Sequence, residues 1–187
     1  MVFSSAQLRI LQLKLRTSFV SQSEREEDKF EKIKGLIREH QFLIEFVGKL
    51  NDAIKNIILL EFALESINGA TALLQLISVK NAIEIPYATM YLLLLVINLS
   101  VIAWSANEII VQSYNIANAV YESNWMDQSE PMKKLLFILL MRAQKPLSID
   151  VGPFRPMNNE AALMTMKGAY TYANVMMQRR TMNRSGQ

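Results

Sequence analysis

The segment Ile85 to Asn107, IPYATMYLLLLVINLSVIAWSAN, contains no charged residue and constrains this chain more than any other segment. At 1.5 Å per residue, a helix of this length crosses a hydrocarbon core about 30 Å thick. Pro86 suits a first helical turn, and Tyr87, Tyr91 and Trp104 lie near the ends, where aromatic rings prefer the membrane interface. The segment therefore predicts a transmembrane helix over residues 85–107. The alternative is a core helix that a soluble protein buries on every side.

The residues before this segment have the apolar spacing of helices. Residues 6–20 and 28–50 each place apolar side chains every three or four positions, with charged residues between them and a polar break at 21–27. Over residues 53–79 the same spacing continues with few charges. We expect one helix that begins in water and crosses the membrane over residues 53–79, preceded by cytoplasmic helices over residues 1–52.

The residues after the charge-free segment are more polar and more broken. An amphipathic helix is expected to follow residue 108, with a break at Asp127 to Pro131 and a short helix from Lys133 to Ala143. Gly152 and two prolines then predict a loop. A final helix is expected over residues 159–182, with Asn159 as its N-cap, and residues 183–187 form a tail.

The distribution of Lys and Arg predicts an orientation. Cytoplasmic segments carry an excess of these residues, which places residues 1–52 and the anchor segment 108–158 in the cytoplasm. Two spans then cross as an up-down pair joined by a short outer turn at Lys80 to Glu84. The last helix would end outside with the tail 183–187, although Arg179, Arg180 and Arg184 count against that end.

Composition excludes several functional classes. The net charge of +3 is spread along the chain without a basic stripe, so we expect no nucleic acid as partner. The chain has no cysteine, which removes thiol chemistry and zinc knuckles. Glu61 and Glu65 share a helix face, but no Glu-x-x-His accompanies them, and they are expected to make hydrogen bonds within the cytoplasmic end of a helix bundle. We expect no enzyme, no metal and no cofactor; a soluble α-helical adaptor remains the alternative.

Three stretches resemble one family. NAVYESNW at 118–125 resembles the Ala-x-Tyr-x-Ser-x-Trp signature of insect odorant receptors. The stretch RAQKPLSIDVGPFRPMNNEAALMTMKGAYTYANVM looks like the closing segment of the same family, with Tyr170-Thr171-Tyr172 in place of a Tyr-Ser-Tyr-like motif. REHQFLIEFVGKLNDAIKNIILLEFALES is similar to its cytoplasmic helix and fifth span. The order and spacing of these stretches together carry the resemblance.

The resemblance implies a fold and a function. Family members have seven spans in about twice this length, so the chain resembles their C-terminal portion, with spans five to seven. The expected fold is an all-α membrane helical bundle with long cytoplasmic helical extensions. The implied function is a subunit of an odorant-gated, non-selective cation channel for olfactory detection. Such subunits form a heterotetramer with a co-receptor subunit, are multi-pass proteins of the plasma membrane, contact membrane lipid and bind a volatile odorant.

The resemblance also implies roles for the final helix, which lines the pore in the family. The face that we expect to line it has small residues, with Met166 as the apolar constriction and Lys167 to one side. The alternative is an ordinary core helix with a snorkelling lysine. The predicted pore-lining residues are Ala162, Thr165, Met166, Ala169 and Ala173.

Two further sites follow from the same resemblance. The family's odorant pocket lies in the outer half of the membrane, where Tyr87, Met90, Tyr91 and Leu94 provide an apolar surface. The signature residues Tyr121, Ser123 and Trp125 would belong to a cytoplasmic anchor that joins subunits. The alternative for Tyr121 and Trp125 is burial in a helical core, since aromatic side chains carry large apolar areas.

Overall fold

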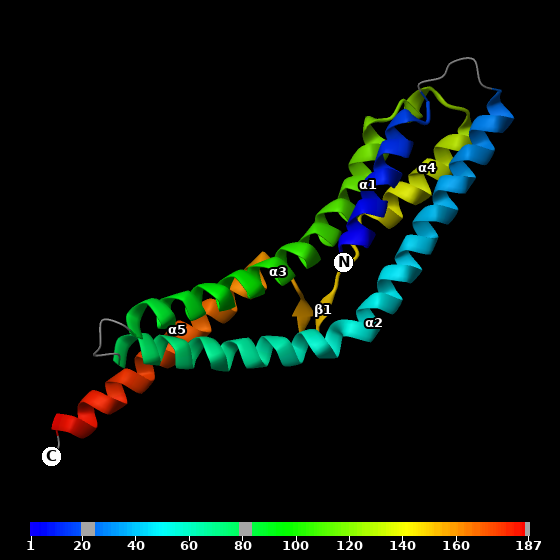
Figure 1. The fold of residues 1–187 in the computed structure, drawn as a ribbon. Coiled ribbons are helices and arrows are strands. Elements are labelled where there is room, and N and C mark those ends of the chain that lie inside the picture. The colour runs from blue at the N-terminus through cyan, green and yellow to red at the C-terminus, as the bar shows by residue number, and fades with distance from the viewer. Residues whose placement is uncertain (20–24, 79–83, 186–187) are drawn as a thin grey trace. The chain divides into compact units, whose positions relative to one another are not determined.

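The computed structural model describes residues 1–19, 25–78 and 84–185, and for residues 180–185 only the helical backbone. Within these residues the chain is all-α, as predicted, apart from one small hairpin (Figure 1). The elements are α1 (Val2–Thr17), α2 (Glu26–Ser78), α3 (Glu84–Glu122), the 3-10 turn η1 (Trp125–Asp127), α4 (Glu130–Ala143), β1 (Asp150–Val151), β2 (Arg155–Pro156) and α5 (Asn159–Ser185).

The two long helices run without interruption. In α2, Glu26, Glu27 and Asp28 occupy the first turn, where negative charge interacts favourably with the helix dipole. The helix then passes from charged residues into the apolar segment, as its spacing predicts. The helix α3 continues beyond the apolar segment to Glu122, so the amphipathic residues after 108 belong to the same helix.

Several helix boundaries differ from the sequence predictions. The break predicted at Asp127 to Pro131 lies earlier, because α3 ends at Glu122 and α4 already begins at Glu130, with Pro131 in its first turn. The predicted cap of the last helix is also wrong by one residue. Asn158, not Asn159, caps α5, since its Oδ1 accepts a hydrogen bond from the backbone N–H of Ala161 at 2.8 Å.

Two predicted connections lie partly outside the described residues. The outer turn at Lys80 to Glu84 falls there except for Glu84, with which α3 begins. In the predicted tail 183–187, residues 183–185 are the last turn of α5. Residues 186–187 are not described.

The chain divides into two compact units. Unit 1 comprises residues 1–53 and 105–149, and unit 2 comprises residues 54–104 and 150–187, so α2 and α3 contribute to both. Unit 1 is a bundle of α1, α4 and parts of α2 and α3. Its core is continuous and apolar, because each helix contributes residues from one face; fully covered examples are Leu8, Leu11, Ile33, Leu43, Ile109, Ile116, Met132 and Leu136.

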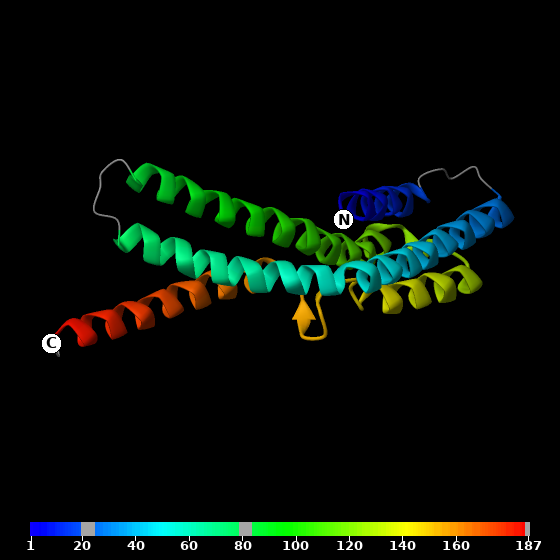
Figure 2. The same cartoon turned by 60° about the horizontal axis from the view of Figure 1, so that its bottom comes forward.

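Unit 2 has an exposed apolar surface. Its parts of α2 and α3 run side by side (Figure 2), and both helices are long and apolar enough to cross a membrane. Only 17% of the most apolar window of α2 and 11% of that of α3 are buried. A core helix of a soluble protein would be mostly buried, and such large apolar surfaces are not stable in water. The exposure therefore counts against both the soluble-core alternative and the soluble-adaptor alternative.

The hairpin attaches the start of α5 to α2 within unit 2. The backbone N–H of Gly152 donates to the carbonyl of Lys55 at 3.0 Å. Gly152 has a φ of +57°, a conformation that costs other residues free energy, and a Cβ there would lie 2.8 Å from Leu59 Cδ2. The chain reverses tightly at Gly152. The close approach of Gly152 to α2 holds the hairpin, and with it the start of α5, against that helix.

Replacing Gly152 tests this attachment. Gly152→Ala should destabilise the chain by about 1–3 kcal/mol, because the left-handed backbone is strained and Leu59 has to move. The measurement is thermal unfolding of the purified chain in lipid nanodiscs. Gly48→Ala is the matched control: a Cβ there meets nothing within 4 Å, so alanine should be neutral or stabilising inside α2. Equal effects of the two substitutions would contradict the attachment.

Candidate functional site

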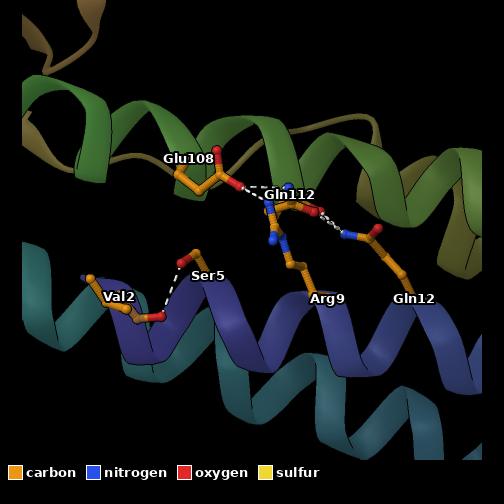
Figure 3. Close-up of polar contacts among 6 residues, drawn as sticks. All are labelled: Val2, Ser5, Arg9, Gln12, Glu108 and Gln112. Carbon is orange, nitrogen blue, oxygen red and sulfur yellow. Dashed lines mark hydrogen bonds and ion pairs between the residues drawn. The ribbon is translucent and has the colours of Figure 1, made fainter.

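A polar cluster joins α1 to α3 in unit 1 (Figure 3). The Arg9 guanidinium pairs with Glu108 Oε1 at 2.5 Å. Gln112 Nε2 donates to the same carboxylate at 2.8 Å. Gln12 Nε2 donates to both the backbone carbonyl and the side-chain Oε1 of Gln112, at 2.8 and 2.9 Å. We call Arg9, Gln12, Glu108 and Gln112 the α1–α3 clasp.

Burial makes the clasp important for unit 1. Gln12 is 6% exposed and Gln112 is 7% exposed, so their amides have little access to water. A buried amide that loses its partner costs about 1–3 kcal/mol. The sequence does not reveal this pairing, because the two glutamines are far apart in the chain and each sits in an amphipathic helix where glutamine is ordinary. The clasp fixes the register of α1 on α3.

The clasp predicts non-additive mutations. Gln12→Leu and Gln112→Leu should each destabilise the chain by about 1–3 kcal/mol, because each removes the buried hydrogen bond between the two side chains and leaves a polar atom of the other glutamine without that bond. The double variant should cost at least about 0.5 kcal/mol less than their sum. Thermal unfolding in nanodiscs measures the three values. Lys14→Ala, which breaks the exposed Lys14–Glu39 ion pair, is the control and should cost at most about 1 kcal/mol. Strict additivity would show that the two glutamines do not interact.

The single histidine lies in the core of unit 1. His40 of α2 is 3% exposed. Burial, and secondarily the positive charge of Arg142 on α4, lower the pKa of His40 from 6.5 to about 4. The imidazole is therefore neutral at neutral pH, and it acts as a packing residue between helices.

The lowered pKa of His40 predicts a pH dependence. The imidazole of His40 binds a proton more tightly in the unfolded chain than in the folded chain. The contribution of neutral His40 to the free energy of unfolding is therefore fully present above pH 6.5 and is lost as the pH falls toward 4. The full change corresponds to about 3 kcal/mol. Thermal unfolding between pH 4.5 and 7.5 measures most of this change. His40→Leu should flatten the profile in this window, and an unchanged profile would assign the dependence to other groups.

The signature residues lie at the end of α3 and in the turn that follows it. Ser123 is buried, and its backbone N–H and Oγ both donate to the carbonyl of Val120, at 3.2 and 2.6 Å. Its own carbonyl accepts from the backbone N–H of Trp125 at 2.7 Å, which starts η1. Tyr121 is 73% exposed and Trp125 is half-buried. The alternative of two aromatics in a helical core is therefore wrong for Tyr121 in this chain.

Two carboxylates meet one amide in unit 2. Asn98 Nδ2 of α3 donates to Glu65 Oε1 at 2.7 Å and to Glu61 Oε1 at 3.1 Å. Both carboxylates therefore make hydrogen bonds, as predicted, and their place at the cytoplasmic end of the bundle stays a prediction. Within the part of the chain that the structure describes, no group of three potential metal ligands occurs.

The predicted pore face of α5 packs on the chain's own helices. Ala162, Ala169 and Ala173 are buried, and a Cβ added at Gly69 of α2 would lie 3.5 Å from Ala169 Cβ. A side chain covered by its own subunit does not line a water-filled conduit, which counts against a pore role for these three alanines in this conformation. Their small size instead lets α5 approach α2 and α3 closely.

Thr165 and Met166 are half-buried and line cavities. Both line a cavity of about 210 Å³ between α2, α3 and α5, whose other walls include Glu65, Leu92, Leu95 and Leu99. We call it the three-helix cavity. Met166 also borders an open groove of about 500 Å³ between α3 and α5, next to Trp104.

The predicted odorant-binding residues are on the outer surface of α3. Tyr87, Met90, Tyr91 and Leu94 are all exposed. None of them is a wall of three cavities of unit 2, which are lined by residues such as Trp104, Leu92 and Gly168 respectively. The structure thus leaves them available to lipid or to other protein, and their role in ligand binding stays a prediction.

A row of polar residues runs along α5, flanked by exposed apolar side chains such as Leu163 and Val175. Glu160, Lys167, Thr171 and Gln178 are exposed and Asn174 is half-buried. Their spacing of three, four or seven residues places them on one face, opposite Ala162, Ala169 and Ala173. We call these five residues the α5 polar stripe. Consistent with this stripe, α5 is not among the helices of the described chain that are apolar enough to cross a membrane by composition.

Long, exposed apolar helices joined to a water-compatible bundle define a helical membrane protein. Residues 1–170 match the family model described as 7tm Odorant receptor. The chain therefore belongs to the odorant receptor family, and the resemblance seen in the sequence is confirmed.

Curated relatives come from several insects. The chain is 29% identical over 177 residues to Odorant receptor 10 of Aedes albopictus, covering 94% of this chain and 47% of that protein. It is 31% identical over 179 residues to Odorant receptor 30a of Drosophila melanogaster, covering 94% and 46%. It is also 31% identical over 148 residues to Odorant receptor Or2 of Anopheles gambiae, covering 79% and 39%. The chain thus spans about half the length of the curated relatives it matches.

A solved structure shares the fold. The olfactory receptor OR5 of Machilis hrabei, determined in complex with eugenol, superposes with a TM-score of 0.77 at 18% sequence identity. The match covers 94% of this chain and 45% of that receptor. The predicted fold class, an all-α bundle like that of insect odorant receptors, is confirmed.

Proposed function

We propose that this chain is part of an odorant receptor subunit of a ligand-gated, non-selective cation channel. The subunit acts in olfactory detection of volatile chemicals, in the plasma membrane, as a heterotetramer with a co-receptor subunit. Family membership and the shared fold support the receptor role. The observation that carries the channel role is the α5 polar stripe, because it is the polar surface of a unit whose other long helices are apolar.

The environment of unit 2 supports a conduit next to α5. Within unit 2, the exposed faces of α2 and α3 carry many large apolar side chains, such as Leu64, Ile67 and Ile97. These faces are compatible with lipid, whereas a lysine facing hydrocarbon costs several kcal/mol. Lys167 and its polar neighbours on α5 therefore require water or a protein partner. A water-filled passage between subunits satisfies this requirement.

The proposal changes which face of α5 lines the passage. The predicted pore residues Ala162, Ala169 and Ala173 pack on the chain's own helices. We place Lys167, Thr171 and Asn174 on the conduit side. Thr165 and Met166, at the edge of the packed face, are candidates for a constriction that changes when α5 moves.

Cysteine accessibility distinguishes the two faces of α5. The 187 residues contain no cysteine, so a single introduced thiol is the only one in this chain. We expect Thr171→Cys to react with a charged, water-soluble thiol reagent and to change an odour-evoked cation current recorded in cells that also contain the co-receptor. Ala173→Cys, two residues away and buried, is the matched control and should react slowly without effect on current.

The outcomes separate the alternatives. Reaction at Ala173→Cys but not at Thr171→Cys would restore the face predicted from the sequence. Currents that are insensitive to reagent at both positions would remove α5 from the conduit. Absence of any odour-evoked current in cells with surface-expressed receptor and co-receptor would contradict the channel function itself.

A further inference from the structure

We propose that the three-helix cavity binds a small lipophilic amine in its protonated form, with Glu65 as the recognising group. This inference rests on the proposed receptor function and names a ligand class for it. The cavity is separate from the exposed α3 residues predicted to bind odorant, since Tyr87, Met90, Tyr91 and Leu94 are not among its walls.

The walls of the cavity select a lipophilic body. Leu92, Leu95 and Leu99 of α3 line one side, and Thr165 and Met166 of α5 line another. Apolar walls with a few polar groups are typical of sites for small molecules. The volume of about 210 Å³ lies below the usual range for drug-sized ligands, so the cavity favours a small molecule.

Glu65 supplies a negative charge at the cavity wall. Its Oε1 accepts from Asn98, and the same amide donates to Glu61. An asparagine amide is neutral and shares its two N–H donors between two carboxylates, so both retain unused acceptor positions. Among the residues that the structure describes, neither Glu61 nor Glu65 forms an ion pair with a basic side chain.

Charge complementarity then identifies the ligand class. Two carboxylates in the apolar part of a membrane protein are costly without a cation. An ammonium group beside Glu65 would provide that cation and a charge-assisted hydrogen bond, while its hydrocarbon body would contact the leucines. A neutral alcohol of the same shape supplies the hydrogen bond without the charge, and a hydrocarbon supplies neither.

The location of the cavity links binding to α5. Thr165, Met166 and Ala169 lie on its α5 wall, and the α5 polar stripe is on the opposite side of the same helix. An occupant of the cavity would contact α5 directly. Binding is therefore positioned to shift the helix that we place beside the conduit.

The test compares matched probes on the purified chain in nanodiscs of phosphatidylcholine, a lipid with no net charge. Binding is measured at pH 7.5 for cyclohexylmethylamine, cyclohexylmethanol and methylcyclohexane. Measurements with empty nanodiscs are subtracted to correct for partition of each probe into lipid. We expect the amine to bind at least about tenfold more tightly than the alcohol, and the hydrocarbon most weakly. Glu65→Gln should weaken amine binding about ten- to a hundredfold and leave alcohol binding nearly unchanged.

Glu45→Gln is the matched control, because it makes the same change at an exposed position of α2, where Glu45 pairs with Lys49. It should bind the amine like the unchanged chain. Circular dichroism confirms that each variant is folded. Equal binding of amine and alcohol, or equal amine binding to the Glu65→Gln variant, would overturn the inference. If the amine does not bind but other volatiles evoke currents, the amine site is contradicted and the receptor function is supported.

Discussion

The exposed apolar length of α2 and α3 is the constraint on which the rest of the structure depends. These helices bury few of their most apolar residues within the chain, so they need a hydrocarbon environment or further protein around them. Both helices also continue into unit 1, where their faces become amphipathic and pack with α1 and α4. The same two helices are thus suited to hydrocarbon in unit 2 and to water in unit 1. Charged residues are more frequent in the unit 1 part of each helix than in the unit 2 part.

The opposite faces of α5 follow from the same constraint. Small residues on one face allow α5 to pack closely on α2, as the approach of Gly69 to Ala169 demonstrates. The polar stripe on the other face is unsuited to lipid. A helix with this pattern is stable in a membrane only when its polar face meets water or a polar partner. This is the physical basis for placing a conduit beside α5.

The sequence predicted most of the helices because their signals are local. Helical spacing predicted the continuous α2, and the charge-free segment predicted the apolar part of α3. The order and spacing of the three family-like stretches identified the family correctly. Boundaries were less accurate: the one-residue error at Asn158 arose because two asparagines in succession are equally good caps by sequence.

The sites were harder to predict, because they depend on contacts between distant residues. The pairing of Gln12 with Gln112 leaves no local signal, and neither does the contact of Asn98 with both Glu61 and Glu65. For α5, the spacing predicted a face of small residues but did not reveal what that face packs against. The choice of the small-residue face as pore-lining followed the resemblance, whereas burial of Ala162 and Ala173 favours the opposite face.

The most direct test of this account is the surroundings of the exposed apolar residues in a membrane. A nitroxide label on Ile97→Cys or Ile67→Cys, in the cysteine-free chain reconstituted in lipid, reports collisions with dissolved oxygen and with a water-soluble nickel complex. We expect collisions with oxygen to be more frequent than collisions with nickel at both positions. At the exposed Tyr114→Cys of unit 1, we expect collisions with nickel to be more frequent. Dominant nickel collisions at all three positions would place unit 2 in water and contradict the account.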